Sequence, residues 1–112
     1  MPIYRGTYYP RVFLFTDKNG AAVDITGWEF LSHFKGNKAD ADPPLLELST
    51  ANGGWEVTNG PAGQLQMNIT SDKTVLLTSS KVYFDVLRTD AVPGPMWLFE
   101  ASVPVKDPIT HV

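Results

Sequence analysis

The chain has 112 residues, of which 43% are hydrophobic and 12% aromatic, and this composition predicts one globular domain with a substantial core. Its net charge is −3 and its few Lys and Arg residues are scattered, so we expect no nucleic-acid partner. The chain contains no cysteine, which excludes disulfides, thiolate catalysis and Cys-ligated zinc.

Membrane and export signals are not evident in the sequence. No apolar run approaches the roughly 18 residues needed to span a bilayer, and the N-terminus lacks the basic start and apolar core of a secretion signal. We therefore expect a chain that is made in a cytoplasm and has no membrane partner. On that basis the glycosylation sequon NIT (68–70) is interpreted as part of a strand.

Residues in the first half of the chain alternate in polarity between clusters of turn-forming residues. YYPRVFLFT (8–16) is the first predicted strand, and Pro10 marks an edge or irregular part of it. DKNG (17–20) favours a tight turn. GNKADADPP (36–44) is a polar loop after the next strand, WEFLSHFK (28–35), whose predicted core face consists of Trp28, Phe30, Ser32 and Phe34.

The second half continues the same pattern. LLELST (45–50) and WEVT (55–58) are predicted short strands, and QLQMNIT (64–70) has the strongest alternation in the chain. KVYFDVLRTD (81–90) and MWLFEASVPV (96–105) are the last two strands. The side chains expected to point inward from these segments are Leu46, Leu48, Leu65, Met67, Ile69, Val82, Phe84 and Val86.

One segment, SDKTVLLTSS (71–80), breaks the alternation. We expect a single helical turn capped by Ser71 or Asp72, after which Val75, Leu76 and Leu77 close one end of the fold. With about seven or eight strands and no long helix, residues 1–112 are predicted to form an all-β, single-domain, two-sheet antiparallel β-sandwich, of the jelly-roll or immunoglobulin-like kind.

The polar loop DKNGAAVDITG (17–27) begins like a cation-binding loop, with Asp17 and Asn19 before a glycine. A calcium loop needs oxygen ligands at alternating positions and a closing Glu, but Ala21 and Val23 occupy later positions and no Glu ends the loop. We therefore interpret the loop as a turn, in which Asp24 and its neighbour Thr26 bond to nearby backbone.

Groups that could catalyse a reaction are few. His33 and His111 have no companion that would complete a nucleophile or metal motif, and Asp40 and Asp42 lie in the polar loop, where solvated carboxylates are expected. There is no phosphate loop, dinucleotide fingerprint or nucleophile elbow. We therefore expect no enzyme activity, no metal and no cofactor.

Aromatic side chains near the N-terminus are too many for a small core. They either cover an open end of the domain or contact another protein, as exposed aromatic residues often do. We expect an N-terminal arm (1–9) and a C-terminal tail (106–112) that become ordered on binding a partner. The predicted partner-binding residues are Ile3, Tyr4, Tyr8, Tyr9, Trp55, Trp97, Pro108 and Ile109.

Several segments carry a family resemblance through their order and spacing. They include an aromatic first strand, a D-x-T-G-aromatic corner at 24–28, a strand at 63–70 that leads to a T-x-L-L turn at 74–77, and a closing strand with alternating valines at 101–110. In these features the chain resembles a family of small virion proteins of tailed bacteriophages. It departs from the family at Phe84 and Ala101, where Tyr and Gly are usual.

This resemblance implies a structural, non-catalytic role in the virion, because similar folds serve as head decoration or cement proteins. The partner it implies is the major capsid protein, and a homo-oligomer, a dimer first of all, is expected on the shell. The family is also similar to the N-terminal domain of baseplate upper proteins, so an adaptor that binds tail, baseplate or neck proteins is an alternative. A carbohydrate-binding module that uses Trp55 and Trp97 is a further one.

Overall fold

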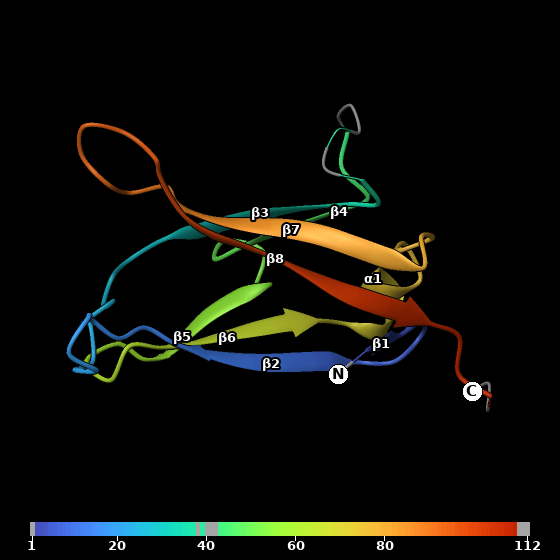
Figure 1. The fold of residues 1–112 in the computed structure, drawn as a ribbon, viewed down its shortest axis with the longest axis horizontal. Coiled ribbons are helices and arrows are strands. Elements are labelled where there is room, and N and C mark those ends of the chain that lie inside the picture. The colour runs from blue at the N-terminus through green and yellow to red at the C-terminus, as the bar shows by residue number, and fades with distance from the viewer. Residues whose placement is uncertain (1, 38, 40–42, 110–112) are drawn as a thin grey trace.

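The computed structural model describes residues 2–37, 39 and 43–109 and contains two sheets packed face to face (Figure 1). The five-stranded sheet has the order β1 (Ile3–Tyr4), β8 (Met96–Lys106), β7 (Lys81–Arg88), β3 (Phe30–Lys35) and β4 (Leu46–Ser49). The three-stranded sheet has the order β2 (Tyr9–Leu14), β6 (Gln64–Ile69) and β5 (Trp55–Asn59). This arrangement confirms the predicted β-sandwich, although β1 pairs with β8 in parallel.

The core forms where the inward faces of the two sheets meet. Alternate residues of β6 are fully buried, as are Val82 and Val86 of β7, so the period of two in the sequence predicted these faces correctly. In β3, Phe30, Ser32 and Phe34 are buried as predicted. Trp28 is only half-buried, because it precedes β3 and lies at the margin of the core.

Trp55, which the sequence suggested as a partner-binding residue, is instead part of this core. It is 1% exposed, and its indole Nε1–H donates to the hydroxyl of Ser32 at 3.0 Å. Ser32 is itself fully buried. The bond therefore explains how a polar side chain on β3 is tolerated between the sheets.

The polar loop after β2 is a turn held by carboxylates. The Asp17 carboxylate accepts hydrogen bonds from the N–H groups of Asn19 and Ala21 at 2.8 and 3.0 Å. Asp24 accepts from the backbone N–H and the hydroxyl of Thr26 at 2.9 and 2.6 Å, and these bonds hold the pKa of Asp24 below its usual value. The predicted Asx-type turn is thus present.

Residues 3–9 belong to the folded domain, which corrects the expectation of a free N-terminal arm. Ile3 is fully buried and lies opposite Val105 of β8, and Tyr9 is 8% exposed. Arg5 fastens this segment, since its Nε donates to the Leu77 carbonyl at 2.6 Å and a second nitrogen donates to the Ser79 carbonyl at 2.9 Å. The segment packs because parallel pairing to β8 gives its backbone partners.

The single helical turn is α1 (Ser71–Thr74). Thr70 occupies the position before it without a side-chain cap bond, so the predicted cap at Ser71 or Asp72 is wrong. Leu77 is buried, whereas Val75 and Leu76 are 50% and 48% exposed and do not close the core as expected. Among the described residues, no helix is long and apolar enough to cross a membrane.

Candidate docking surfaces at the two ends of the sandwich

The structure separates the eight residues suggested for partner binding into two groups. Ile3, Tyr9 and Trp55 are in the core, so the folded domain does not offer them to a partner. The large side chains left in solvent are Tyr4 (41% exposed), Tyr8 (53%), Trp97 (56%) and Ile109 (101%), and Pro108 is partly buried. Because Trp55 is buried and Trp97 exposed, the two tryptophans do not form one sugar-binding surface.

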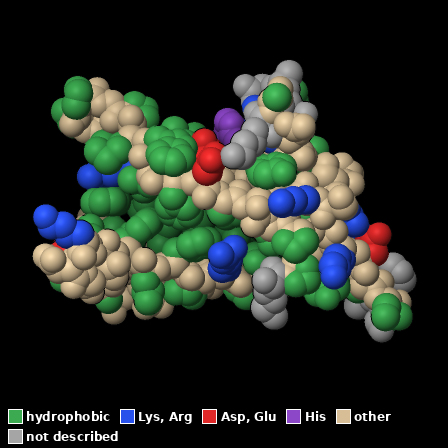
Figure 2. All heavy atoms as spheres, viewed as in Figure 1, with side chains coloured by type: hydrophobic (Ala, Val, Ile, Leu, Met, Phe, Trp, Pro, Cys, Tyr) green, Lys and Arg blue, Asp and Glu red, His purple; other side chains and the backbone are tan. Residues whose placement is uncertain are grey.

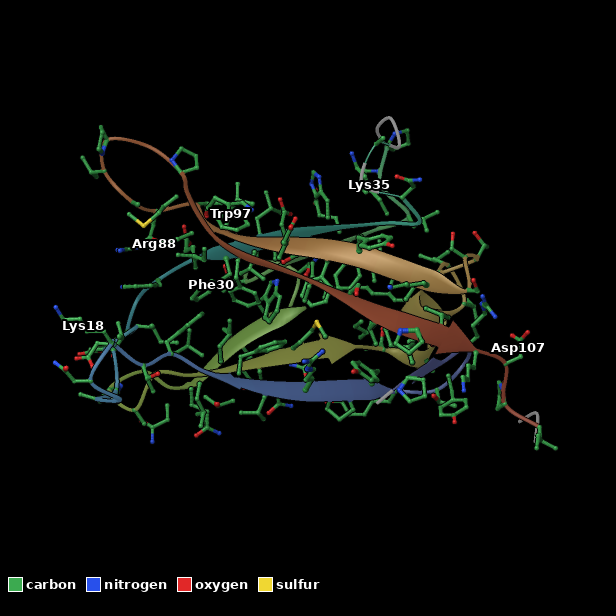
Figure 3. All side chains as sticks on the ribbon, in the orientation of Figure 1. Lys18, Phe30, Lys35, Arg88, Trp97 and Asp107 are labelled. Atoms are coloured by element: carbon green, nitrogen blue, oxygen red, sulfur yellow. The ribbon has the colours of Figure 1, made fainter. Side chains whose placement is uncertain are left out.

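The loop between β7 and β8 projects from one end of the sandwich (Figure 1). The exposed apolar residues of this loop and of the start of β8 form what we call the loop surface: Val92, Pro93, Pro95, Met96 and Trp97. Val92 is 95% exposed, and Figure 3 shows Trp97 at the base of the loop. Exposed apolar groups that are gathered on a protruding loop are typical of a contact with another protein.

Polar contacts hold the start of this loop in place. The Arg88 guanidinium donates to both carboxylate oxygens of Asp90 at 3.0 and 3.2 Å, and the backbone N–H of Glu29 donates to Asp90 at 3.0 Å. These bonds, that from Arg88 foremost, lower the pKa of Asp90 to about 2. Arg88 also lies 4.0 Å over the Trp28 ring. The contacts of Arg88 and Asp90 therefore fix the start of the loop that carries the loop surface.

The opposite end of the molecule carries a second set of exposed apolar residues. Tyr4 on β1, Val75 and Leu76 after α1, and Ile109 after β8 form what we call the helix-end surface. In Figure 1, β1, α1 and the end of β8 gather at the end away from the β7–β8 loop. Thr74 fixes α1 there, because its hydroxyl accepts from the Gly6 N–H at 2.9 Å and donates to the Thr7 carbonyl at 3.0 Å.

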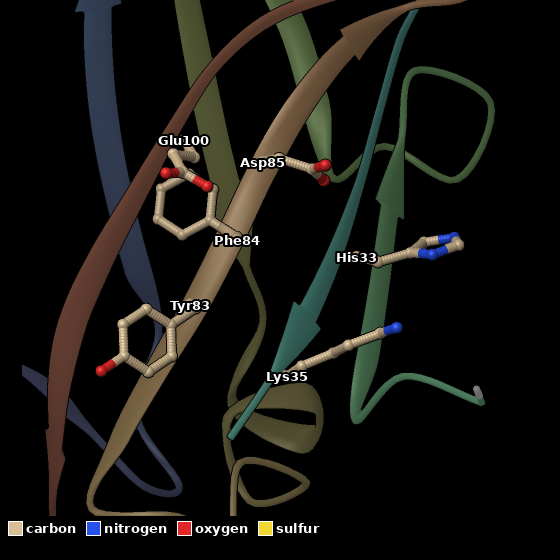
Figure 4. A pocket seen from close by; sticks show the side chains of 6 residues that line it. All are labelled: His33, Lys35, Tyr83, Phe84, Asp85 and Glu100. Carbon is tan, nitrogen blue, oxygen red and sulfur yellow. The ribbon is translucent and has the colours of Figure 1, made fainter. Parts of the chain in front are cut away.

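A shallow pocket of about 210 Å³ lies on the outer face of the five-stranded sheet (Figure 4). Its lining consists of His33, Lys35, Tyr83, Phe84, Asp85 and Glu100. His33 is paired with the Glu47 carboxylate of the neighbouring strand β4 at 2.9 Å. No group of three or more His, Asp or Glu residues in the described parts of the chain is arranged to hold a metal.

The sequence pattern singled out Trp97, Tyr4 and Ile109 on these end surfaces, but it did not single out Val92 or Met96. Val92 lies within the turn-forming segment AVPGP (91–95) and Met96 directly follows it, and their apolar character at a turn was the available signal. Figure 2 shows hydrophobic side chains on the projecting loop and also between the front edges of the two sheets.

Neither a scan of known family models nor a search of curated proteins found a match to this chain.

Proposed function

We propose that this chain is a structural, non-enzymatic protein of a tailed-bacteriophage virion, and that it decorates the head by binding the major capsid protein. The support from the sequence is its resemblance to small virion proteins. The support from the structure is a two-sheet sandwich that exposes apolar side chains at both of its ends.

The observation that carries the proposal is the placement of the two end surfaces. They lie at opposite ends of a body whose largest extent is 41 Å. A domain with two separate apolar contacts can hold two neighbouring shell subunits at once, and burying both contacts would stabilise the lattice. This is the action expected of a cement protein.

An adaptor in the tail, baseplate or neck would use the same two surfaces to join components of a ring. The two roles differ in stoichiometry, because the symmetry of each location sets the number of equivalent sites. The Trp55-based sugar site is not proposed, since that indole is buried and bonded to Ser32.

The deciding measurement is the copy number of this chain in purified virions relative to the major shell protein, by quantitative mass spectrometry. On the order of hundreds of copies per particle supports head decoration, and on the order of ten supports a ring in the tail or neck. Absence of the chain from virions would overturn both assignments.

A further inference from the structure

We propose that two copies of this chain associate through the free edge of β2, so that the two three-stranded sheets join into one continuous antiparallel sheet. The inference concerns an interaction surface different from the two end surfaces. It depends on the backbone of one edge strand and does not rest on the virion assignment.

The edge of β2 offers backbone groups to a new strand. β2 pairs with β6 alone. The N–H of Phe15 donates to the Gly63 carbonyl at 2.9 Å, so the backbone N–H of Phe15 points towards the β6 side of the strand. The backbone N–H and C=O groups of successive residues in a strand point to opposite sides. Those of Val12 and Leu14 therefore point away from β6. No strand among the described residues lies on that side.

The side chains on this edge are apolar and exposed. Val12 is 50% exposed and Leu14 is 66% exposed, both on the outer face of the sheet. Phe13, on the inner face, is only partly buried. An exposed apolar edge strand is a pairing site unless it is blocked.

Charge favours this edge for a second copy over the other edges. The chain has a net charge of −3, so two copies repel one another in general. The remaining long edges each carry a carboxylate, from Glu56 on β5, Glu47 on β4 and Glu100 on β8. The single ionisable side chain within Arg11–Leu14 of β2 is Arg11, which packs 4.8 Å from the centre of its own Phe13 ring.

One two-fold symmetric register pairs the free backbone groups of Val12 and Leu14 and also keeps the two Arg11 charges apart. If Phe13 lies opposite Phe13 of the second copy, then Val12 lies opposite Leu14 and each such pair exchanges two backbone hydrogen bonds. The exposed Val12 and Leu14 side chains then cover one another across the junction. The two Arg11 side chains stand four residues apart in this register, roughly 13 Å along the strands, which avoids close repulsion.

Pro10 and the pairing of β1 with β8 confine the junction to this stretch of β2. Pro10 has no N–H and points its carbonyl to the free edge of β2, so the ladder ends there. On β8 the edge beside Pro104 is already covered, because β1 pairs there, with Ile3 opposite Val105 and Tyr4 opposite Lys106. That end of β8 is therefore not free for edge pairing, and because both copies use the same β2 edge, the junction closes as a dimer.

The first test is sedimentation equilibrium of the full chain over a concentration series. A small interface of this kind predicts a dimer with a dissociation constant on the order of tens of micromolar. Leu14→Lys places a charge on the edge and should weaken association at least ten-fold. Thr58→Lys makes the same charge change on the exposed outer face of β5, at the other edge of the same sheet, and should leave association unchanged. Thermal melts check that both variants fold.

The register has its own test, because the natural chain contains no cysteine. Mixing Val12→Cys chains with Leu14→Cys chains under mild oxidation should yield a disulfide-linked heterodimer, while each variant alone should link poorly. A chain that is monomeric throughout the series, or a dimer that Leu14→Lys leaves intact, would overturn the inference. Its failure would leave the virion copy number untouched, so the two proposals are judged separately.

Discussion

Removing the Ser32 hydroxyl should destabilise the domain although it deletes only one atom. In Ser32→Ala the indole N–H of Trp55, 1% exposed, loses its acceptor at 3.0 Å within the core. A buried donor without a partner costs about 1–3 kcal/mol. For a domain of this size the melting temperature should fall by roughly 4–15 °C. Ser102→Ala removes the same atom from the exposed face of β8 and should shift stability by less than about 0.5 kcal/mol.

A double-mutant cycle separates the bond from the loss of packing. Trp55→Phe removes the donor and also leaves unfilled volume, so alone it should cost more than Ser32→Ala. When both changes are combined, the second should cost about 1–2 kcal/mol less than it does alone, because no orphaned polar group remains. Urea denaturation of the four proteins measures this coupling. A Ser32→Ala variant that melts within 1 °C of the natural chain, on the order of 0.2 kcal/mol, would refute the reasoning.

Three further predictions concern the base of the loop, the N-terminal segment and the loop surface. The pKa of Asp90 is lowered in the fold to about 2 from 3.8. Its stabilising contribution is therefore present above about pH 4 and is lost as the pH falls towards 2. Between these pH values the melting temperature of Asp90→Asn should vary less than that of the natural chain. Arg5→Ala removes the bonds to the carbonyls of Leu77 and Ser79 and should cost about 1–3 kcal/mol in urea denaturation, whereas an unchanged midpoint would show that the segment holds without them. Trp97→Ala should weaken binding to purified expanded shells at least ten-fold, while its free energy of unfolding in urea changes by less than about 0.5 kcal/mol. The control variant Thr58→Ala should leave shell binding unchanged.

Local patterns in the sequence account well for the strands that lie in the middle of a sheet. In β6 and β7, alternation identified Leu65, Met67, Val82 and Val86 as inward, and all four are fully buried. The reason is geometric, because successive side chains of a strand point to opposite faces and only one face meets the other sheet. The Asp24 turn followed for a similar reason, since its bonds reach only two residues along the chain.

Residues whose surroundings come from distant parts of the chain were predicted poorly. Ile3 was assigned to a free arm, but it is buried because β8, about a hundred residues later, offers it a parallel partner. Trp55 was expected at the surface, and its bond to Ser32 joins the two sheets. The number of aromatic residues does not reveal which of them find such partners.

The amino-acid sequence by itself therefore determines the alternation of polarity and the turns, which together predict an all-β domain. Exposure at particular positions depends on how the sheets meet. Val12 and Leu14 are exposed because they lie on the outer face of an edge strand, and Val92 is exposed because its loop projects beyond the sandwich, with Trp97 at the base of that loop. Strand order and loop direction depend on contacts between segments that are distant in the sequence, so local periodicity does not predict them.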